Sequence, residues 1–418
     1  MPRWRWILTQ LTRRLWVRAT LIGLMGVAAA ILAAVVERFI PWDLPTTIGA
    51  DAVGSILNII ASSMLAVTTF SLSVMTAAFG AATSNVTPRA TTLLMEDRLS
   101  QTVLSTFVGS FLFSVVGIVV LNTGAYGDRG RFVLFVVTIA VIALIVVSLL
   151  RWIDHLTRLG RVGETTERVE QAARQAMEAR LRQPHLGGSP LLEIPAGATP
   201  VPAGVVGYVR HIDMSALSHC CEALDADIYV VAIPGVFVYP DTPIAWIDAD
   251  AKPGTEDDPA AAVFKAYTIG NERSFDQDPR FGLAVMAEIG SRALSSAIND
   301  PGTAIDVIGR MTRLMGVWAP SGADAREDPE FPRVHVQSLT SDDMFEDAFM
   351  LMARDGAGHI EIQLRIQKAL RALARLGNDD FRAAAQRQAS LALARAEAAL
   401  ALDEDRTRLR HAAEQTGT

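Results

Sequence analysis

The sequence predicts an α-helical membrane protein: four transmembrane helices, then a cytoplasmic α+β domain with a small β-rich subdomain and a C-terminal helical bundle. Half of the 418 residues are hydrophobic, and the mean hydropathy is +0.27, which is too apolar for an ordinary soluble chain. Nearly all the long apolar runs lie in the first 150 residues. The rest of the chain has a soluble composition and is long enough for one or two packed cores.

Four uncharged apolar segments are each long enough to cross a bilayer, which requires about 20 helical residues. We expect the spans at residues 19–36, 52–80, 103–121 and 132–150. A cleaved signal peptide is the alternative for the first segment. Its apolar run is longer than a signal core and further spans follow, so we expect the helix to be retained. The second helix is longer than a bilayer requires, and we expect Thr87-Pro88-Arg89 to end it.

The placement of arginine predicts the orientation. Cationic residues cluster on the cytoplasmic side of bacterial inner-membrane proteins. One side of the expected spans carries Arg3, Arg5, Arg13, Arg14, Arg18, Arg89, Arg98, Arg151, Arg158 and Arg161, and the other carries only Arg38, Arg129 and Arg131. We therefore expect an inner (plasma) membrane protein with both termini in the cytoplasm, which agrees with an even number of spans.

The second half of the chain is expected to contain four parts. Residues 161–182 have helical spacing and form a connector, and the proline- and glycine-rich residues 183–204 form a linker. Residues 205–260 form the small β-rich subdomain, because short β-branched and aromatic runs alternate there with turn residues. These runs are 205–209, 228–233, 236–239 and 244–247, with a short helix at 215–224. Residues 261–418 are mostly helical, with helices expected at 281–298 and 301–318.

A polar stripe runs along the second expected span. Six of its residues fall within an arc of about 60° on a helix. They are Ser55, Asn58, Ser62, Thr69, Ser73 and Thr76. Such a stripe either lines an aqueous path or mediates close packing between helices, which small and hydroxyl residues also do in lipid. None of the four expected spans contains Asp, Glu, Lys, Arg or His, and this disfavours a proton-coupled pump.

Composition and cysteine placement limit the partners. The net charge is −7 and no long basic tract occurs, so we expect no nucleic-acid partner. Cys220 and Cys221 are adjacent, which argues against a disulfide framework. Neighbouring residues on a helix point about 100° apart, so the two cysteines do not readily hold one metal ion with His211 or His219. We expect no metal site and no cofactor.

A charged corner surrounds Ser295 to Asp306. Asp300 is expected to cap a helix that begins at Pro301, which by itself explains the Asn-Asp-Pro sequence. The alternative is a site for an anionic small ligand, because many charged groups lie near this helix start. Glu288 and Arg292 are spaced to pair along one helix. The ligand-binding candidates are Arg273, Asp276, Asp278, Arg292, Asn299, Asp300 and Thr303.

Two further stretches resemble a known family. Phe70 to Met75 with Thr87-Pro88-Arg89 form one signature, and Asp278 to Leu283 with Arg292 to Ala304 form the other. Together they are similar to an uncharacterised family of bacterial predicted membrane proteins, a domain-of-unknown-function family of about this length. Ser296 stands where that pattern has proline. The resemblance implies a multi-pass membrane protein and adds no reaction.

Two classes of function remain open. The first is an oligomeric channel or transport-type protein with a cytoplasmic regulatory domain, in which the second helices line a pathway. The second is a membrane-anchored sensor or scaffold whose cytoplasmic domain binds a ligand or a protein. An enzyme is not expected, because the sequence has no nucleophile elbow, phosphate-binding glycine loop, zinc-binding helix motif or dinucleotide fingerprint.

The expected topology is tested with reporter fusions. A fusion after Leu150 should report the cytoplasm, and a fusion at Gly127 should report the exterior, because the positive-inside rule places them on opposite sides. Protease digestion of the C-terminal domain from outside intact cells would contradict this orientation.

Overall fold

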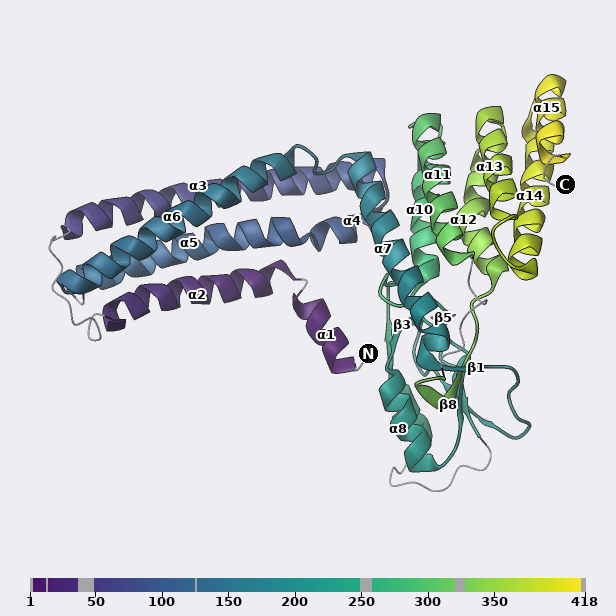
Figure 1. Cartoon of the computed structure of the whole chain (residues 1–418), viewed down its shortest axis with the longest axis horizontal. Coiled ribbons are helices and arrows are strands. Elements are labelled where there is room, and N and C mark those ends of the chain that lie inside the picture. Colours follow the sequence, from purple (N-terminus) through teal and green to yellow (C-terminus); the bar gives the residue numbers. More distant parts are fainter. Residues whose placement is uncertain are drawn as a thin grey trace. The chain divides into compact units, whose positions relative to one another are not determined.

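The computed structural model describes residues 3–12, 14–36, 49–124, 126–248, 258–319 and 328–414. Within them, four helices are long and apolar enough to cross a membrane, followed by mixed sheets and helices and then C-terminal helices, as Figure 1 shows. The predicted fold class is therefore confirmed. The sequence also predicts a short acidic connection at 37–51 and loops at 248–259 and 321–332, and these segments lie largely outside the described residues.

The four candidate spans are α2 (Leu15–Val36), α3 (Ala50–Asn85), α5 (Arg98–Asn122) and α6 (Asp128–Leu156). Short helices α1 (Arg3–Thr12) and α4 (Pro88–Met95) lie between or before them. Every long helix extends beyond the span expected from the sequence. The 36 residues of α3 correspond to roughly 54 Å, well above the roughly 30 Å of a bilayer core. As predicted, this helix ends just before Pro88.

Glycine allows α2 and α5 to pack closely. A β-carbon on Gly26 would lie 2.6 Å from the carbonyl oxygen of Gly109, and one on Gly109 would lie 2.8 Å from the side chain of Ile22. Only glycine permits such a backbone approach, which increases van der Waals contact between helices in lipid. α5 also buries Ser105, Ser110 and Ser114, so its small polar residues serve packing within the chain.

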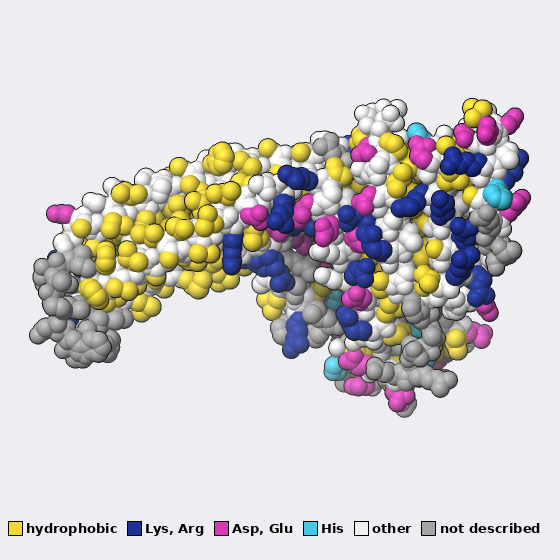
Figure 2. Space-filling model, turned by 45° about the horizontal axis from the view of Figure 1, so that its top comes forward, with side chains coloured by type: hydrophobic (Ala, Val, Ile, Leu, Met, Phe, Trp, Pro, Cys, Tyr) yellow, Lys and Arg dark blue, Asp and Glu magenta, His cyan; other side chains and the backbone are white. Residues whose placement is uncertain are grey.

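A buried hydrogen-bond network joins three of these helices. The indole nitrogen of Trp152 donates to the hydroxyl of Ser71 at 2.9 Å, and the Trp152 ring stacks on His155. His155 Nε2 lies 3.1 Å from the carboxylate of Asp97, which caps the first turn of α5. Both residues lie outside the expected spans: Asp97 immediately precedes α5, and His155 lies in the part of α6 that extends beyond its expected span. Figure 2 shows hydrophobic side chains over much of the surface of these long helices.

The remaining structure forms a second compact unit. It comprises Thr165–Thr418 together with Met1–Trp6 and Asn85–Ala90. The first two candidate spans separate Trp6 from Asn85, and the other two separate Ala90 from Thr165. Three stretches of the chain, each separated by a pair of spans, therefore fold together.

Two sheets form one half of this unit. The strands are β1 (Gly188–Pro190), β2 (Thr199–Pro202), β3 (Gly207–Ile212), β4 (Ile228–Val230), β5 (Phe237–Val238), β6 (Pro243–Ile247), β7 (Tyr267–Gly270) and β8 (Phe331–Val336). The first sheet has the order β1-β8-β4-β6-β2, with β8 parallel to both neighbours and the other pairs antiparallel. The second is antiparallel with the order β5-β3-β7. Ile212, Ile228, Val334 and other buried residues fill their shared core.

The structure corrects two expectations about this half. Residues 183–204, expected to be a linker, contain a short 3-10 helix at Pro184–Gly187 and the strands β1 and β2. Residues 261–418, expected to be mostly helical, also contribute β8 to the first sheet and β7 to the second. The proline content of β2 suits an edge strand, where missing amide donors cost no pairing.

Helices form the other half of the unit. They are α7 (Val162–Arg182), α8 (Met214–Leu224), α9 (Pro259–Lys265), α10 (Pro279–Ala293), α11 (Pro301–Trp318), α12 (Ser341–Asp355), α13 (Ile360–Leu373), α14 (Asp379–Ala399) and α15 (Asp403–Glu414). α10 to α15 lie together as a bundle (Figure 1). The helix expected at 281–298 ends five residues early, because the chain turns after Ala293.

A buried carboxylate ties α7 to α11. Glu170 accepts hydrogen bonds from Arg310 at 2.8 Å and from Arg313 at 2.8 and 3.0 Å. Burial acts to raise the pKa of Glu170, but Arg313 and Arg310 outweigh it and hold the pKa below its ordinary value. The charged form is therefore favoured in the folded protein.

We expect Glu170→Gln to lower the free energy of unfolding by about 2 kcal/mol, because two guanidinium groups lose their shared anion. Because the pKa of Glu170 is lowered in the folded protein, the stabilisation that its carboxylate contributes is complete above about pH 4.3, the ordinary pKa of Glu. It is lost as pH falls through the folded pKa. In thermal unfolding in detergent, Glu170→Gln should melt at a lower temperature than the wild type at pH 7, and the difference should become smaller in acid. Glu178→Gln, which removes an exposed pair with Arg182 on the same helix, is the control and should change little.

Candidate functional site

The polar stripe lies on the exposed side of α3. All six of its residues are exposed in the single chain: Ser55, Asn58, Ser62, Thr69, Ser73 and Thr76. The opposite side of α3 carries the buried residues Val53, Leu57, Ile60 and Met64, which pack on the neighbouring helices. Packing within the chain therefore does not account for the stripe, in contrast to the buried serines of α5.

Most hydroxyls of the stripe bond to their own helix. Ser62, Thr69, Ser73 and Thr76 each donate to the carbonyl oxygen four residues earlier, at 2.9 to 3.1 Å. Each hydroxyl has one donor and two acceptor sites, so the acceptors remain available. The side-chain amide of Asn58 has no hydrogen-bond partner among the described residues.

The stripe continues toward both ends of the helix. Asp51 and Gly80 are exposed on the same arc, and a β-carbon on Gly80 would have open space around it. Successive members are three or four residues apart, with one gap of seven between Ser62 and Thr69, so all of them lie on one face of the helix, as in a seam between helices. Large apolar residues such as Ile59 and Phe70 flank it and are also exposed.

The ligand candidates divide between the two ends of α10. Arg273, Asp276 and Asp278 lie at its start, and Arg292, Asn299, Asp300 and Thr303 lie at or beyond its end. The 15 residues of this helix separate the groups by roughly 22 Å. The structure therefore does not bring the seven residues into one site.

The group at the start of α10 is satisfied internally. Asp278 caps the helix and forms a two-point ion pair with Arg273 at 2.8 and 3.0 Å. Its carboxylate lies against Gly235, where φ is +100° and any β-carbon would collide with it. Burial raises the pKa of Asp278, against the lowering effect of Arg273. Asp276 accepts from Ser274 and from the indole of Trp6, each at 3.0 Å.

The group at the end of α10 is mostly a structural corner. Asn299 has a positive φ of 49°, and Asp300 accepts from the backbone N–H of Thr303 at 3.0 Å and from its hydroxyl at 2.6 Å. The expected cap at Asp300 is therefore confirmed. Arg292 is different, because its half-buried guanidinium forms no ion pair with any described residue.

Sequence reasoning missed the partners of Glu288. The expected pair with Arg292 is wrong: Glu288 instead accepts from Arg89 at 2.7 Å and from the hydroxyl of Thr87 at 3.0 Å. Thr87 immediately precedes α4 and Arg89 lies in its first turn, and both belong to the stretch Asn85–Ala90 that folds with the second unit. The Thr-Pro-Arg signature and the second signature were both visible in the sequence, but nothing in it indicated that they meet.

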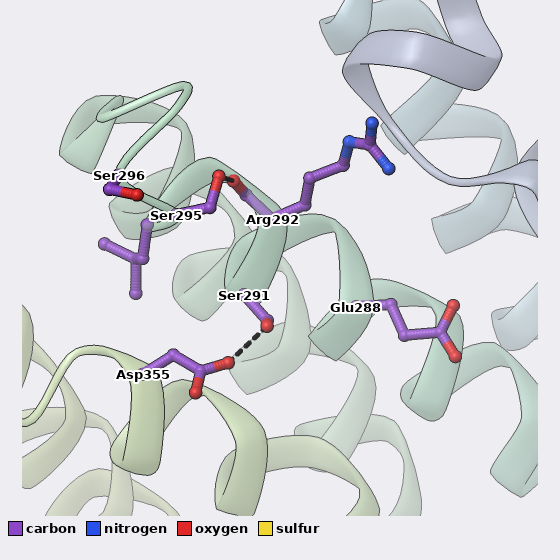
Figure 3. Close-up of a pocket in the computed structure, with 7 residues that line it drawn as sticks. Glu288, Ser291, Arg292, Ser295, Ser296 and Asp355 are labelled. Atoms are coloured by element: carbon purple, nitrogen blue, oxygen red, sulfur yellow. Dashed lines mark hydrogen bonds between the residues drawn. The ribbon is translucent and has the colours of Figure 1, made fainter.

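A cavity of about 510 Å³ opens beside the end of α10. Its polar lining is Glu288, Ser291, Arg292, Ser295, Ser296 and Asp355. Figure 3 shows Glu288 and Arg292 extending to the same side of α10, while Ser291 points to Asp355 and hydrogen-bonds to it. Among the described residues, no group of three or more His, Cys, Asp or Glu side chains is placed to hold a metal, and Cys220 and Cys221 form no disulfide.

Comparison with known proteins agrees with this architecture. The family described as "Predicted membrane protein (DUF2254)" matches residues 12–372, from the first helix to the end of α13. The chain belongs to this family. It is a membrane protein with four candidate spans, which agrees with the family resemblance of the two sequence signatures.

Two mycobacterial proteins are similar over part of their length. They are "Uncharacterized protein Rv1290c" of Mycobacterium tuberculosis and "Uncharacterized protein Mb1321c" of Mycobacterium bovis, each 34% identical over 140 residues. The match covers 32% of this chain and 26% of each relative, so it spans about a quarter of their length. No solved structure matches the chain.

The cap at Asp300 gives a direct test of the corner. Asp300→Ala should lower the free energy of unfolding by about 1 kcal/mol. Asp300→Ser should keep most of the stability that the cap contributes, because the serine hydroxyl accepts a hydrogen bond from the same N–H group. Thermal unfolding of the two variants in detergent measures this. Equal loss in both variants would mean that Asp300 does more than cap α11.

Proposed function

We propose that copies of this chain assemble through α3 and that the polar stripe lines a transport pathway regulated by the cytoplasmic domain. The observation that carries this proposal is the exposure of the whole stripe on a helix whose other side packs within the chain. A single chain in a bilayer would turn this stripe toward lipid.

Asn58 makes that exposure to lipid unfavourable. Its amide has no partner in the described chain, and an unpaired amide in hydrocarbon costs several kcal/mol. A second copy or water at this face would supply the missing hydrogen bonds. Small residues spaced by three and four positions favour the close approach of another helix. These two features support a homo-oligomer.

The hydroxyl geometry is compatible with a pathway. Because the donors of Ser62, Thr69, Ser73 and Thr76 bond to their own helix, their free lone pairs make this face rich in acceptors. Rows of oxygen acceptors replace water around cations and hydrogen-bond donors in pores. We therefore expect a cation or a neutral polar solute rather than an anion.

The orientation is part of the proposal. We place the protein in a bacterial inner membrane with both termini in the cytoplasm. Arginine placement supports this, and so does the folding of residues 1–6, 85–90 and 165 onward as one unit. Pairs of spans that leave one unit and return to it begin and end on the same side.

The second candidate is a membrane-anchored sensor or scaffold. One observation favours it: the hydroxyls that bond to their own backbone need no water, so the stripe could be a packed interface alone. In both cases we propose a role without catalysis, because the sequence carries no catalytic motif.

Cysteine substitution separates the two candidates. In a chain whose Cys220 and Cys221 are replaced, Thr69→Cys and Ser73→Cys should react with a charged, water-borne thiol reagent. Phe70→Cys is the matched control: it neighbours Thr69 and is 64% exposed, but it lies off the stripe. It should not react, because a thiol that faces lipid forms no thiolate.

Oxidative cross-linking completes the test. Disulfide-linked dimers through Thr69→Cys, with no reaction toward the charged reagent and no solute flux in reconstituted vesicles, would support the anchored scaffold. Absence of both cross-linking and reaction at the stripe would contradict assembly through α3.

A further inference from the structure

The cavity at the end of α10 contains two carboxylates, and both are already neutralised. Glu288 pairs with Arg89, and Asp355 pairs with Arg354 at 2.7 Å while also accepting from Ser291. Arg354 and Ser291 hold the pKa of Asp355 below its ordinary value, against the effect of burial. Neither Glu288 nor Asp355 therefore forms an ion pair with the one cationic side chain that lines this cavity.

That cation is Arg292. Its Nε atom is buried and has no hydrogen-bond partner in the described chain, and the guanidinium forms no ion pair there. A buried donor left unpaired costs about 1–3 kcal/mol, and more when it is charged. Glu288 precedes Arg292 by four residues on the same helix, a spacing at which the two side chains can pair. Its carboxylate instead accepts hydrogen bonds from Arg89 and Thr87. The site is thus complete except for an acceptor.

We propose that this cavity binds a small phosphate-type oxyanion at Arg292, and that binding fixes Glu288 on Arg89, in the first turn of α4. The planar fork of donors on arginine matches the oxygens of a phosphate group. The cavity volume of about 510 Å³ accommodates a small metabolite or a lipid headgroup.

Competition for Glu288 couples the ligand to Arg89. Without the anion, Glu288 has two alternative cations, Arg89 and Arg292. The anion occupies Arg292, which leaves Arg89 as the partner of Glu288, and Arg89 in turn keeps a negative charge away from the anion site. By thermodynamic linkage, anion binding at Arg292 strengthens the pairing of Glu288 with Arg89, and this pairing strengthens anion binding by the same factor. Any effect on a pathway lined by α3 rests on the function proposed above, whereas the binding itself does not.

Binding is measured by thermal shift and titration calorimetry of the full chain in detergent, with inorganic phosphate as the probe. Phosphate should raise the melting temperature of the wild-type protein, because a ligand specific to the folded state stabilises it. Arg292→Ala should remove this shift. Arg375→Ala is the matched control, since it removes an exposed arginine of the same unit that has no ion pair in the described chain.

A double-mutant cycle tests the coupling. Arg89→Ala should weaken phosphate binding about twofold to fivefold, because Glu288 then turns to Arg292, four residues along the helix. In a Glu288→Gln background the same Arg89→Ala change should have no effect, since the competing carboxylate is gone. An equal loss in both backgrounds would overturn the coupling, because Arg89 would then act on phosphate directly.

Nanodiscs distinguish the two sources of the phosphate group. In phosphatidylcholine discs, free phosphate should stabilise the wild type but not Arg292→Ala. If added phosphatidylglycerol raises the melting temperature of the wild type alone and abolishes the response to phosphate, the occupant is a lipid headgroup. If the response persists, the occupant is soluble. If neither phosphate nor phosphatidylglycerol distinguishes the wild type from Arg292→Ala, the site does not exist.

Discussion

Hydrocarbon offers no hydrogen-bond partner to a polar group, and the organisation of the long helices depends on this constraint. Serines of α5 are buried against neighbouring helices, Trp152 donates to Ser71, and hydroxyls of α3 donate to the preceding turn of their own helix. A polar atom that is hydrogen-bonded within the chain needs no partner from a second copy of the protein. The hydroxyls of Ser105 and Ser114 also lack a hydrogen-bond partner, but they are buried within the chain. The unpaired amide of Asn58 is exposed, and it is the strongest physical reason to place another molecule against α3.

The N-terminal half was largely predictable because its pattern is one-dimensional. Apolar length and the position of a proline can be read along the chain, so the four spans and the end of α3 shortly before Pro88 followed from the sequence alone. The cap at Asp300 was predictable for the same reason, since it involves only the next turn. The exposure of the polar stripe was not, because its arc is the same whether neighbouring helices cover it or leave it open.

The second half was harder because its contacts are remote. The strand β8 lies more than a hundred residues from its partners β1 and β4, and its six residues include Pro332, Arg333 and His335. Such a short polar strand is weak evidence by itself, and the prolines around β2 looked like a linker. The pairing of Glu288 with Arg89 spans 199 residues, whereas the i,i+4 rule pointed to Arg292. In each case a tertiary contact prevailed over a valid local preference.

The central position of β8 also constrains the order in which the protein is made. Among the strands that the structure describes, β8 is the single partner of β1 and one of the two partners of β4. A ribosome must therefore synthesise all four apolar helices and about 180 further residues before this sheet can close. Until then, the apolar faces of β4 and β6 remain incompletely covered. Until β8 is made, the edge of β4 that it later occupies is unpaired, which is the state of a sheet that is most open to pairing with another chain.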